Sequence, residues 1–227
     1  MKLVIAEKPS VAQTIAKVIG AYKREKGYLE GSGYIVSWCI GHLVGLVPPD
    51  SYDEKYRRWN KEDLPIIPEN WLYEVSSDKT EQFDILKGLM HREDVDYVVN
   101  ACDAGREGEL IFRLVYKKAG CGKPMKRLWI NSMEDEAIRK GFDELRDGKD
   151  YNRLYDTAVC RSETDWLVGM NATRLFTTLY HHRLTVGRVQ TPTLALVVDR
   201  NDKIRNFEKQ KYFTIDLQLG ELTVSSE

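Results

Sequence analysis

The stretch LVIAEKPSVAQTIAKVIG, residues 3–20, decides the fold. Its first four residues are an apolar run typical of a buried strand, and the acid Glu7 follows that run directly. Pro9 suits the first turn of a helix, because that turn leaves its N–H groups unpaired and Pro has none. Apolar residues then recur at helical spacing up to Gly20, at Val11, Ile15, Val18 and Ile19. The stretch therefore predicts a strand, an acidic turn and a helix.

The same order of strand, acid and helix returns later in the chain. An apolar run at residues 97–102 ends at Asp103, and helical spacing follows at 107–118. Further strands are expected at 34–40 and 127–130, and further helices at 79–90 and 134–145. Strands that alternate with helices predict an α/β fold with a mostly parallel sheet and flanking helices.

Composition excludes several classes of protein. The chain has 227 residues, of which 42% are hydrophobic and 30% charged, and its net charge is −1. These values exclude disordered and collagen-like chains and disfavour a protein that coats polyanions generally. No apolar run approaches the length of a membrane span, and the N-terminus lacks the pattern of a signal peptide. The four cysteines form no metal-binding pair, and Cys39 and Cys102 fit small buried thiols. A reduced, cytoplasmic protein is expected.

The pattern changes near residue 150, where helical periodicity replaces the alternation of strands and helices. We expect an α/β domain at 1–150, a mainly helical segment at 151–211, and the start of a further domain at 212–227. Residues 43–71 are rich in Pro, Tyr, Trp and charge, which predicts a long surface excursion. Alternation of apolar residues predicts a strand at 212–219, for which the sequence offers no partner strand.

Acidic residues stand at two of the predicted strand ends. The carboxyl ends of neighbouring parallel strands lie together, so Glu7, Asp103 and Glu107 are expected to converge. Gathered carboxylates repel one another, and a divalent cation such as Mg²⁺ relieves that repulsion. The alternative is that Glu7 is a turn acid and Asp103 a helix cap. Gly105 and Gly108 flank the helix start and favour close approach of the backbone to a ligand. No P-loop is present, and no dinucleotide site is expected.

A second feature is the absence of Asp and Glu from residues 166–198, in a chain with 35 acidic residues. Arg174, Arg183 and Arg188 give this strip a positive charge that suits single-stranded DNA. Trp166 and Arg174 are eight residues apart and can share one helix face. The loop Thr185, Val186, Gly187, Arg188, Val189 and Gln190 offers Gly for close approach, Arg for phosphate and Gln for a base edge. The alternative is a buried helix pair with a core tryptophan.

Several motifs together resemble a known family. They are Ile5-Ala6-Glu7-Lys8-Pro9-Ser10, the Asp-x-x-Arg-Glu-Gly-Glu pattern at 103–109, Trp38-Cys39-Ile40-Gly41-His42-Leu43, Tyr56-x-x-Trp59, Arg161-Ser162-x-x-Asp165-Trp166, and Thr185-Val186-Gly187-Arg188-Val189-Gln190-Thr191-Pro192. This set resembles the type IA DNA topoisomerases, and within them the topoisomerase III branch. The resemblance covers essentially the whole chain and implies a Rossmann-like Toprim domain followed by a helical domain.

The resemblance also implies roles for individual residues. Glu7 matches an acid beside the scissile phosphate, which exchanges a proton and binds metal, and Lys8 matches a lysine that neutralises that phosphate. Asp103 and Glu107 match further catalytic and Mg²⁺-binding acids. Trp59 and Trp166 match tryptophans that contact DNA, and Arg174 follows in the same helix.

Two departures from the family pattern are visible. Gly105 stands where the family usually has a second Asp, so one expected metal ligand is missing. None of the 12 tyrosines lies in a Tyr-Pro-Arg-Thr setting, which is where the family places its nucleophile. We therefore expect the N-terminal portion of such an isomerase, inactive by itself.

The function implied by the resemblance is Mg²⁺-dependent, ATP-independent cleavage, passage and resealing of single DNA strands. The expected partner is single-stranded DNA, with no membrane, no nucleotide cofactor, a monomeric state and a place at the nucleoid. One alternative is another Toprim enzyme of nuclease or primase type, which would have no need of Trp166 or the 185–190 loop. Another is a non-enzymatic single-strand-binding module, which would have no need of the acids.

Overall fold

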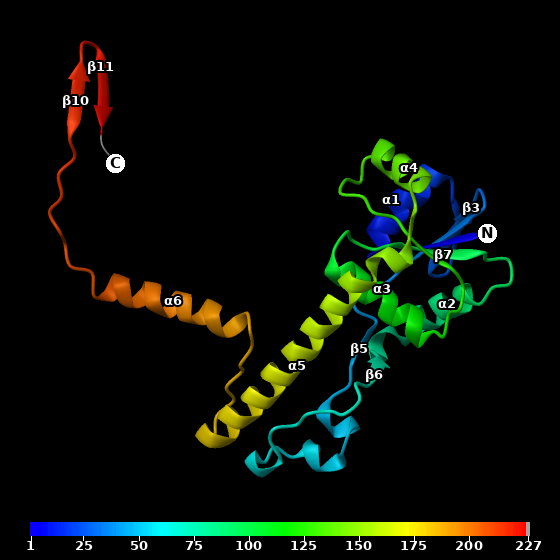
Figure 1. The fold of residues 1–227 in the computed structure, drawn as a ribbon, viewed down its shortest axis with the longest axis horizontal. Helices are drawn as coiled ribbons and strands as arrows, with labels where there is room; N and C mark the ends of the chain where they lie inside the picture. Colours follow the sequence, from blue (N-terminus) through cyan, green and yellow to red (C-terminus); the bar gives the residue numbers. More distant parts are fainter. Residues whose placement is uncertain (226–227) are drawn as a thin grey trace. The chain divides into compact units, whose positions relative to one another are not determined.

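A computed structural model describes residues 1–225 of the chain, as two compact units, 1–185 and 186–225. The first unit is built on a seven-stranded sheet (Figure 1). Its strands are β1 (Lys2–Ala6), β2 (Lys23–Glu25), β3 (Tyr28–Gly31), β4 (Tyr34–Trp38), β7 (Tyr97–Ala101), β8 (Met125–Arg127) and β9 (Arg146–Asp147). The order across the sheet is β2-β3-β4-β1-β7-β8-β9.

The expected α/β architecture is confirmed, with a refinement at both edges of the sheet. The four central strands, β4, β1, β7 and β8, run parallel. The outer strands β2, β3 and β9 run antiparallel, so the sheet is mixed. The strand predicted at 127–130 lies earlier, because only Met125–Arg127 pairs with β7.

Helices cover both faces of this sheet. They are α1 (Pro9–Ile19), α2 (Thr80–Met90), α3 (Arg106–Lys118), α4 (Asp135–Asp143) and α5 (Asn152–Tyr180). The core on one face gathers residues of α1 and α4, and the core on the other face gathers residues of α2, α3 and the start of α5. Alternate residues of β1 serve the two cores, Leu3 and Ile5 one of them, Val4 and Ala6 the other.

The opening strand, turn and helix form as expected. Every residue of β1 from Leu3 to Ala6 is buried, as a central strand requires. Pro9 begins α1, and Gly20 ends it in the left-handed conformation that glycine adopts without strain. The buried thiols expected at Cys39 and Cys102 are also confirmed, and both belong to the core that contains Ile5.

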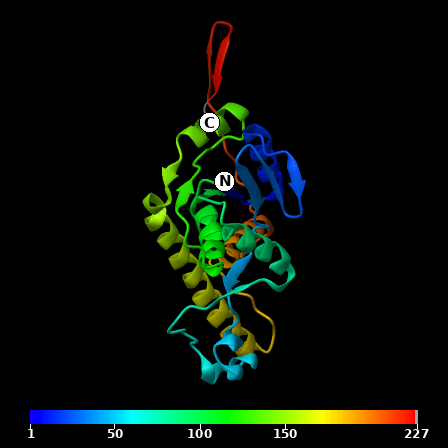
Figure 2. The ribbon, with the colours of Figure 1, turned by 90° about the vertical axis from the view of Figure 1, so that its right-hand side faces the viewer.

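The expected surface excursion contains short ordered pieces. Its ends form an antiparallel pair, β5 (Val44–Leu46) with β6 (Tyr73–Val75). Between them lies a lobe, residues 47–72, with the 3-10 turns η1 (Pro49–Ser51), η2 (Glu54–Arg57) and η3 (Lys61–Asp63). The lobe lies beside the C-terminal half of α5, which runs past residue 174 to Tyr180 (Figures 1 and 2). Asn171 joins the two, because its amide oxygen accepts from Ile66 N and its amide nitrogen donates to Ile66 O.

The second unit contains α6 (Gln190–Arg205) and a hairpin of β10 (Asp216–Leu219) and β11 (Leu222–Ser225). The expectation of a strand without a partner at 212–219 is wrong. Residues 216–219 pair with 222–225 around Gly220, whose positive φ of 64° suits a tight turn. The last two positions of the predicted 212–227 segment, 226 and 227, lie outside the described residues.

A network of buried charges lies beneath the end of β7. Glu109 is 1% exposed, and its carboxylate is 2.7 Å from Arg127 Nε and 2.8 Å from Arg113 Nε. Asn100 of β7 donates to the same carboxylate at 3.0 Å. Burial lowers the pKa of Arg127, while the charge of Glu109 acts in the opposite direction. Glu109 therefore balances two arginines inside the domain.

We predict that Glu109→Gln lowers the free energy of unfolding of the first unit by about 3–5 kcal/mol, since it leaves two buried arginines without a counter-charge. Urea unfolding followed by tryptophan fluorescence measures this, because all five tryptophans lie in the first unit. The exposed Glu136→Gln is the control and should change stability by no more than about 0.5 kcal/mol. A loss below about 1 kcal/mol for Glu109→Gln would show that the network is not a structural requirement.

Candidate active site at the carboxyl edge of the sheet

Two of the predicted acids follow neighbouring parallel strands. Ala6 at the end of β1 lies opposite Ala101 at the end of β7. Glu7 comes directly after Ala6, and Asp103 comes two residues after Ala101. We call this region, formed by the ends of β4, β1 and β7, the carboxyl edge. Both acids therefore lie at the edge where an open parallel sheet places its ligands.

Glu7 is held in a partly buried position at this edge. Its side chain is 13% exposed, and its carboxylate is 3.7 Å from the exposed ammonium of Lys8. Continuing the register of β4, β1 and β7 by one residue places Glu7 between Cys39 and Cys102. The Cys39 thiol and burial raise the pKa of Cys102 well above its ordinary value, so this thiol stays protonated. The buried Cys102 thiol therefore acts as packing beside Glu7 rather than as a nucleophile.

The backbone at Asp103 is fixed from two sides. The guanidinium of Arg127 donates to Cys102 O and Asp103 O, each at 2.7 Å. On the other side, α3 approaches so closely that a Cβ on Gly108 would overlap the Asp103 carbonyl oxygen. The carboxylate of Asp103 remains at the surface while its main chain is held in place.

Glu107 is directed toward α5. One of its carboxylate oxygens is 3.2 Å from Arg161 Nη1, and the other is 3.7 Å from His42 Nε2. A cleft of about 330 Å³ surrounds these contacts. It is lined by His42, Glu107, Leu110, Ala158, Arg161, Ser162 and Asp165.

The three predicted metal ligands do not form a ready-made cluster. Within residues 1–225, no three His, Cys, Asp or Glu side chains are arranged to hold a metal ion. Glu107 is instead paired with Arg161 and His42. A Mg²⁺ site on Glu7, Asp103 and Glu107 therefore stays a prediction. Glu7 and Asp103 alone satisfy the preference of Mg²⁺ for one or two carboxylates, with water and phosphate completing its shell.

The predicted DNA contacts Trp59 and Arg174 lie together, between the lobe and α5. The guanidinium of Arg174 lies 5.2 Å from the ring centre of Trp59 and donates to Tyr56 O at 2.7 Å. Arg174 is only 7% exposed, and its burial lowers its pKa. Trp59 is 40% exposed. Trp59 therefore offers an aromatic surface to solvent, whereas Arg174 mainly supports the lobe.

Trp166, on α5, packs against the lobe. Its indole N–H donates to Val47 O at 3.1 Å. Its ring meets those of Tyr52 and Trp71 edge-on, with centroid distances of 6.0 Å and 5.4 Å. These contacts give Trp166 a structural role in joining the lobe to α5, and a role in DNA contact stays a prediction.

The predicted loop at 185–190 crosses from one unit to the other. Thr185 ends the first unit, and Val186, Gly187, Arg188, Val189 and Gln190 begin the second. Thr191 N donates to Gly187 O, and Gly187 N donates to Thr191 Oγ1, both at 3.1 Å. The loop therefore forms the start of α6, with the side chain of Arg188 exposed.

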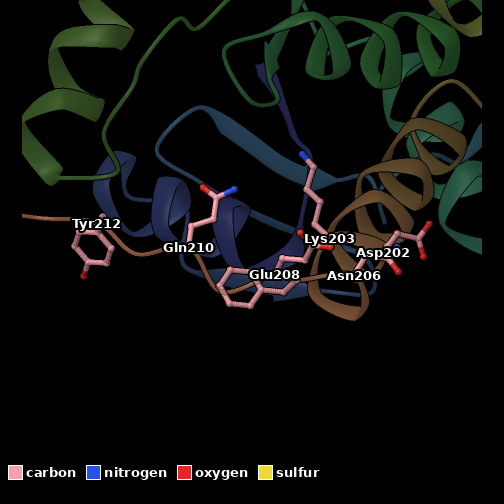
Figure 3. A pocket seen from close by; sticks show the side chains of 7 residues that line it. Asp202, Lys203, Asn206, Glu208, Gln210 and Tyr212 are labelled. Carbon is pink, nitrogen blue, oxygen red and sulfur yellow. The ribbon is translucent and has the colours of Figure 1, made fainter.

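None of these residues lines the hollow found within the second unit. It measures about 810 Å³ and lies in the second unit, at the last turn of α6 and the segment after it (Figure 3). Its lining residues are Asp202, Lys203, Asn206, Phe207, Glu208, Gln210 and Tyr212. Acidic and basic groups alternate along this open surface, which gives it no preference for one charge of ligand.

Three residues at the site make structural contacts that the sequence analysis did not predict. Glu109 and Arg127 hold the Asp103 backbone, and Arg161 holds Glu107. The spacing of Glu109 and Arg113, four residues apart on one helix, was the available sign of a buried pair. The contacts of Arg127 and Arg161 join distant parts of the sequence, so no local pattern reveals them.

We predict that Gly108→Ala destabilises the first unit by about 1–3 kcal/mol, because the added methyl group would overlap the Asp103 main chain. Helix propensity alone would give the opposite sign, since Ala favours a helix over Gly by about 1 kcal/mol. Gly105→Ala is the matched control, because its Cβ meets no atom within 4 Å. Thermal unfolding of both variants measures the difference. A Gly108→Ala variant as stable as the wild type would contradict the close packing.

Comparison with known proteins supplies the family. The Toprim domain family matches residues 2–133, and a family described as DNA topoisomerase matches residues 149–227. DNA topoisomerase 3 of Bacillus thuringiensis (strain Al Hakam) is 51% identical over 216 residues, which is 95% of this chain and 30% of the relative. DNA topoisomerase 3 of Bacillus licheniformis is 48% identical over 223 residues, 98% of this chain and 31% of the relative.

A solved structure agrees with this result at the level of the fold. The full-length topoisomerase I of Thermotoga maritima superimposes with a TM-score of 0.64 at 22% identity. That match covers 98% of this chain and 34% of the other. The chain thus spans about a third of the length of the proteins it matches. From the match over residues 2–133 and the mixed sheet with its acidic carboxyl edge, the chain belongs to the Toprim family.

Proposed function

We propose that this chain supplies the Toprim portion of a type IA DNA topoisomerase of the topoisomerase III kind. The observation that carries the proposal is the identity of 48–51% to proteins called DNA topoisomerase 3, along nearly the whole chain. The reaction would cut one DNA strand, pass another through the break and reseal it without ATP. The placement of Glu7 and Asp103 at one sheet edge supports this assignment.

The chain's own residues would act on the scissile phosphodiester as follows. A tyrosine hydroxyl loses its proton to water, and its oxygen forms a bond to phosphorus while the bond from phosphorus to the 3′ oxygen breaks. Glu7, partly buried at the carboxyl edge, gives a proton to the departing 3′ oxygen and takes it back on resealing. The exposed ammonium of Lys8 neutralises charge on the phosphate oxygens. No tyrosine here has the family's Tyr-Pro-Arg-Thr setting, so we propose that the nucleophile comes from another part of the protein.

Glu7 and Asp103, with Glu107 as a third contributor, would hold Mg²⁺ at this site. The ion would supply positive charge to the reacting phosphate. The donor set fits, because carboxylate oxygens at a solvent-exposed edge leave room for water and phosphate ligands. For Glu107 to take part, its carboxylate has to leave Arg161 or His42.

The proposed partner is single-stranded DNA. Its proposed contacts are Trp59, Trp166, Arg174 and the residues 185–190. The exposed ring of Trp59, backed by Arg174, supports a role in base stacking. Arg188 is an exposed cation for a phosphate. Trp166 and Arg174 would act chiefly by holding the lobe that carries Trp59.

The remaining expectations are proposals of the same kind. We propose a monomer that works at the nucleoid in the cytoplasm without a nucleotide cofactor, with domain boundaries near residues 150 and 211. Among residues 1–225 no helix has the length and apolar character to cross a membrane.

We predict that the chain binds single-stranded oligonucleotides but does not relax a supercoiled plasmid. Fluorescence anisotropy over a salt series should show affinity falling with salt, with a log–log slope of about −0.7 for each phosphate contacted. Arg188→Ala should reduce the slope by about one contact, and Trp59→Ala should weaken binding with little change in slope. Salt-independent binding would contradict the proposed DNA path.

Two controls separate DNA contact from folding. Trp166→Ala removes a packed ring, so its thermal unfolding should shift strongly, whereas Trp59→Ala removes a ring that is 40% exposed and should shift thermal unfolding less. Relaxation of plasmid by the purified chain would show that its own tyrosines suffice, against the proposed origin of the nucleophile.

In the longer protein, Glu7→Gln should abolish cleavage or resealing while oligonucleotide binding persists. The substitution keeps the size of the side chain but removes its ability to exchange a proton. A plasmid relaxation gel beside an anisotropy titration measures both properties, with Glu136→Gln as the surface control. If the Glu7→Gln variant relaxes plasmid at the normal rate, Glu7 has no catalytic role and is only a residue of the turn.

A further inference from the structure

A cleft of about 240 Å³ lies at the carboxyl edge beside Asp103. It is lined by Ala101, Cys102, Asp103, Ala104, Ile130, Asn131 and Met133. Only two of these residues have polar side chains suited to a hard cation, the carboxylate of Asp103 and the amide of Asn131. The cleft thus joins a predicted metal ligand to a residue with no assigned role.

The two walls of this cleft are tied together by one side chain. Arg127 Nη2 donates to Asp103 O at 2.7 Å, on the wall that follows β7. Its Nη1 donates to Leu128 O at 2.8 Å, on the wall that leads from β8 to Asn131. Because Arg127 is buried, this link is shielded from solvent. The separation of the walls is therefore set by the fold.

The wall that carries Asn131 is also fixed from behind. A Cβ on Gly141 of α4 would lie 2.5 Å from Ile130 Cγ2 and 2.8 Å from Leu128 Cδ1, so α4 packs directly on this segment. Trp129 stacks on Tyr151 with the ring centres 4.9 Å apart. The main chain leading to Asn131 is held firmly enough to position a ligand.

Asn131 itself is available for a ligand. Its side chain is exposed, and its amide makes no hydrogen bond to another residue within the described part of the chain. Gly105 follows Ala104 of the cleft wall, and a Cβ added there would meet no atom within 4 Å. Gly105 contributes no side-chain oxygen, whereas Asn131 does.

We propose that Asn131 is a ligand of the divalent cation at Asp103, supplying the amide oxygen as a neutral donor. This inference rests on the metal site of the proposed function and adds a residue to it. A neutral amide suits this place, because it adds a ligand without adding to the repulsion between carboxylates. The site would then draw on three strand ends, those of β1, β7 and β8.

The test uses the chain of 227 residues and Mn²⁺, whose binding is followed by electron paramagnetic resonance of the free ion. Mn²⁺ takes the same oxygen ligands as Mg²⁺. Asn131→Ala should raise the Kd for Mn²⁺ by at least about tenfold, because loss of even a residue that only supports a ligand typically costs about 10–100-fold in metal affinity. Asn131→Asp should bind Mn²⁺ at least as tightly as the wild type. Asn70→Ala, an exposed amide in the lobe, should change nothing.

A second variant makes the test specific to the cleft. Gly105 is next to Ala104 of the cleft wall and has room for a side chain, so we expect Gly105→Asp to add a carboxylate to the site and, in the Asn131→Ala background, to restore most of the lost affinity. Failure of this rescue, or a wild-type Kd for Asn131→Ala, would overturn the inference. Circular dichroism of each variant ensures that a lost ion does not reflect a lost fold.

Asp103→Ala distinguishes this inference from the proposed function. If Asp103→Ala loses Mn²⁺ but Asn131→Ala does not, the metal site stands and the role of Asn131 is wrong. If Asp103→Ala binds Mn²⁺ like the wild type, or the wild type binds none at millimolar Mn²⁺, the metal site of the proposed function fails as well.

Discussion

The buried pairing of Glu109 with Arg127 and Arg113 is the interaction on which the site depends. A carboxylate in the protein interior is tolerated only when cations and hydrogen bonds surround it, and Glu109 has two arginines and Asn100. The two terminal nitrogens of the Arg127 guanidinium donate to main-chain carbonyls at the ends of β7 and β8. The charge pair therefore fixes the main chain that presents Asp103 and Asn131.

The three acids of the motif at 103–109 have different roles in this arrangement. Glu109 is buried and stabilises the domain through its pairing with Arg127. Glu107 is exposed and lies close to Arg161 and His42. Asp103 has an exposed carboxylate, while its main chain is held by Arg127. Helical geometry produces the first division, since Glu107 and Glu109 project about 200° apart around α3. Identical side chains thus acquire separate roles from their position on a helix and a strand end.

The sequence predicted those parts of the fold in which local pattern and tertiary context agree. Residues 3–20 and 97–118 are strongly periodic, and both appear as expected. The edge strands β2 and β9 were missed because they are short, polar and exposed, with no alternation to reveal them. The partner of β10 was missed because Leu222–Ser225 is four residues long and close to the chain end.

The sequence names candidate residues for the proposed site but not how they are arranged. The strand ends and the motif at 103–109 predicted that Glu7 and Asp103 lie at one edge of the sheet, and the structure places both there. The packing of Trp166 against Val47, Tyr52 and Trp71, and the clamp of Arg127 on Asp103, depend on contacts between distant residues. No periodicity encodes such contacts, so only the structure separates the exposed Trp59 from the packed Trp166.

We propose that the carboxyl edge of this sheet binds the divalent cation that serves DNA cleavage. Anomalous diffraction from crystals grown with Mn²⁺ and a single-stranded oligonucleotide tests it most directly. We expect a Mn²⁺ peak at a coordination distance of about 2.0–2.6 Å from an Asp103 carboxylate oxygen, with a DNA phosphate among the ligands of the ion. Mn²⁺ bound only at other acidic residues, with the carboxyl edge free of both metal and phosphate, would contradict it.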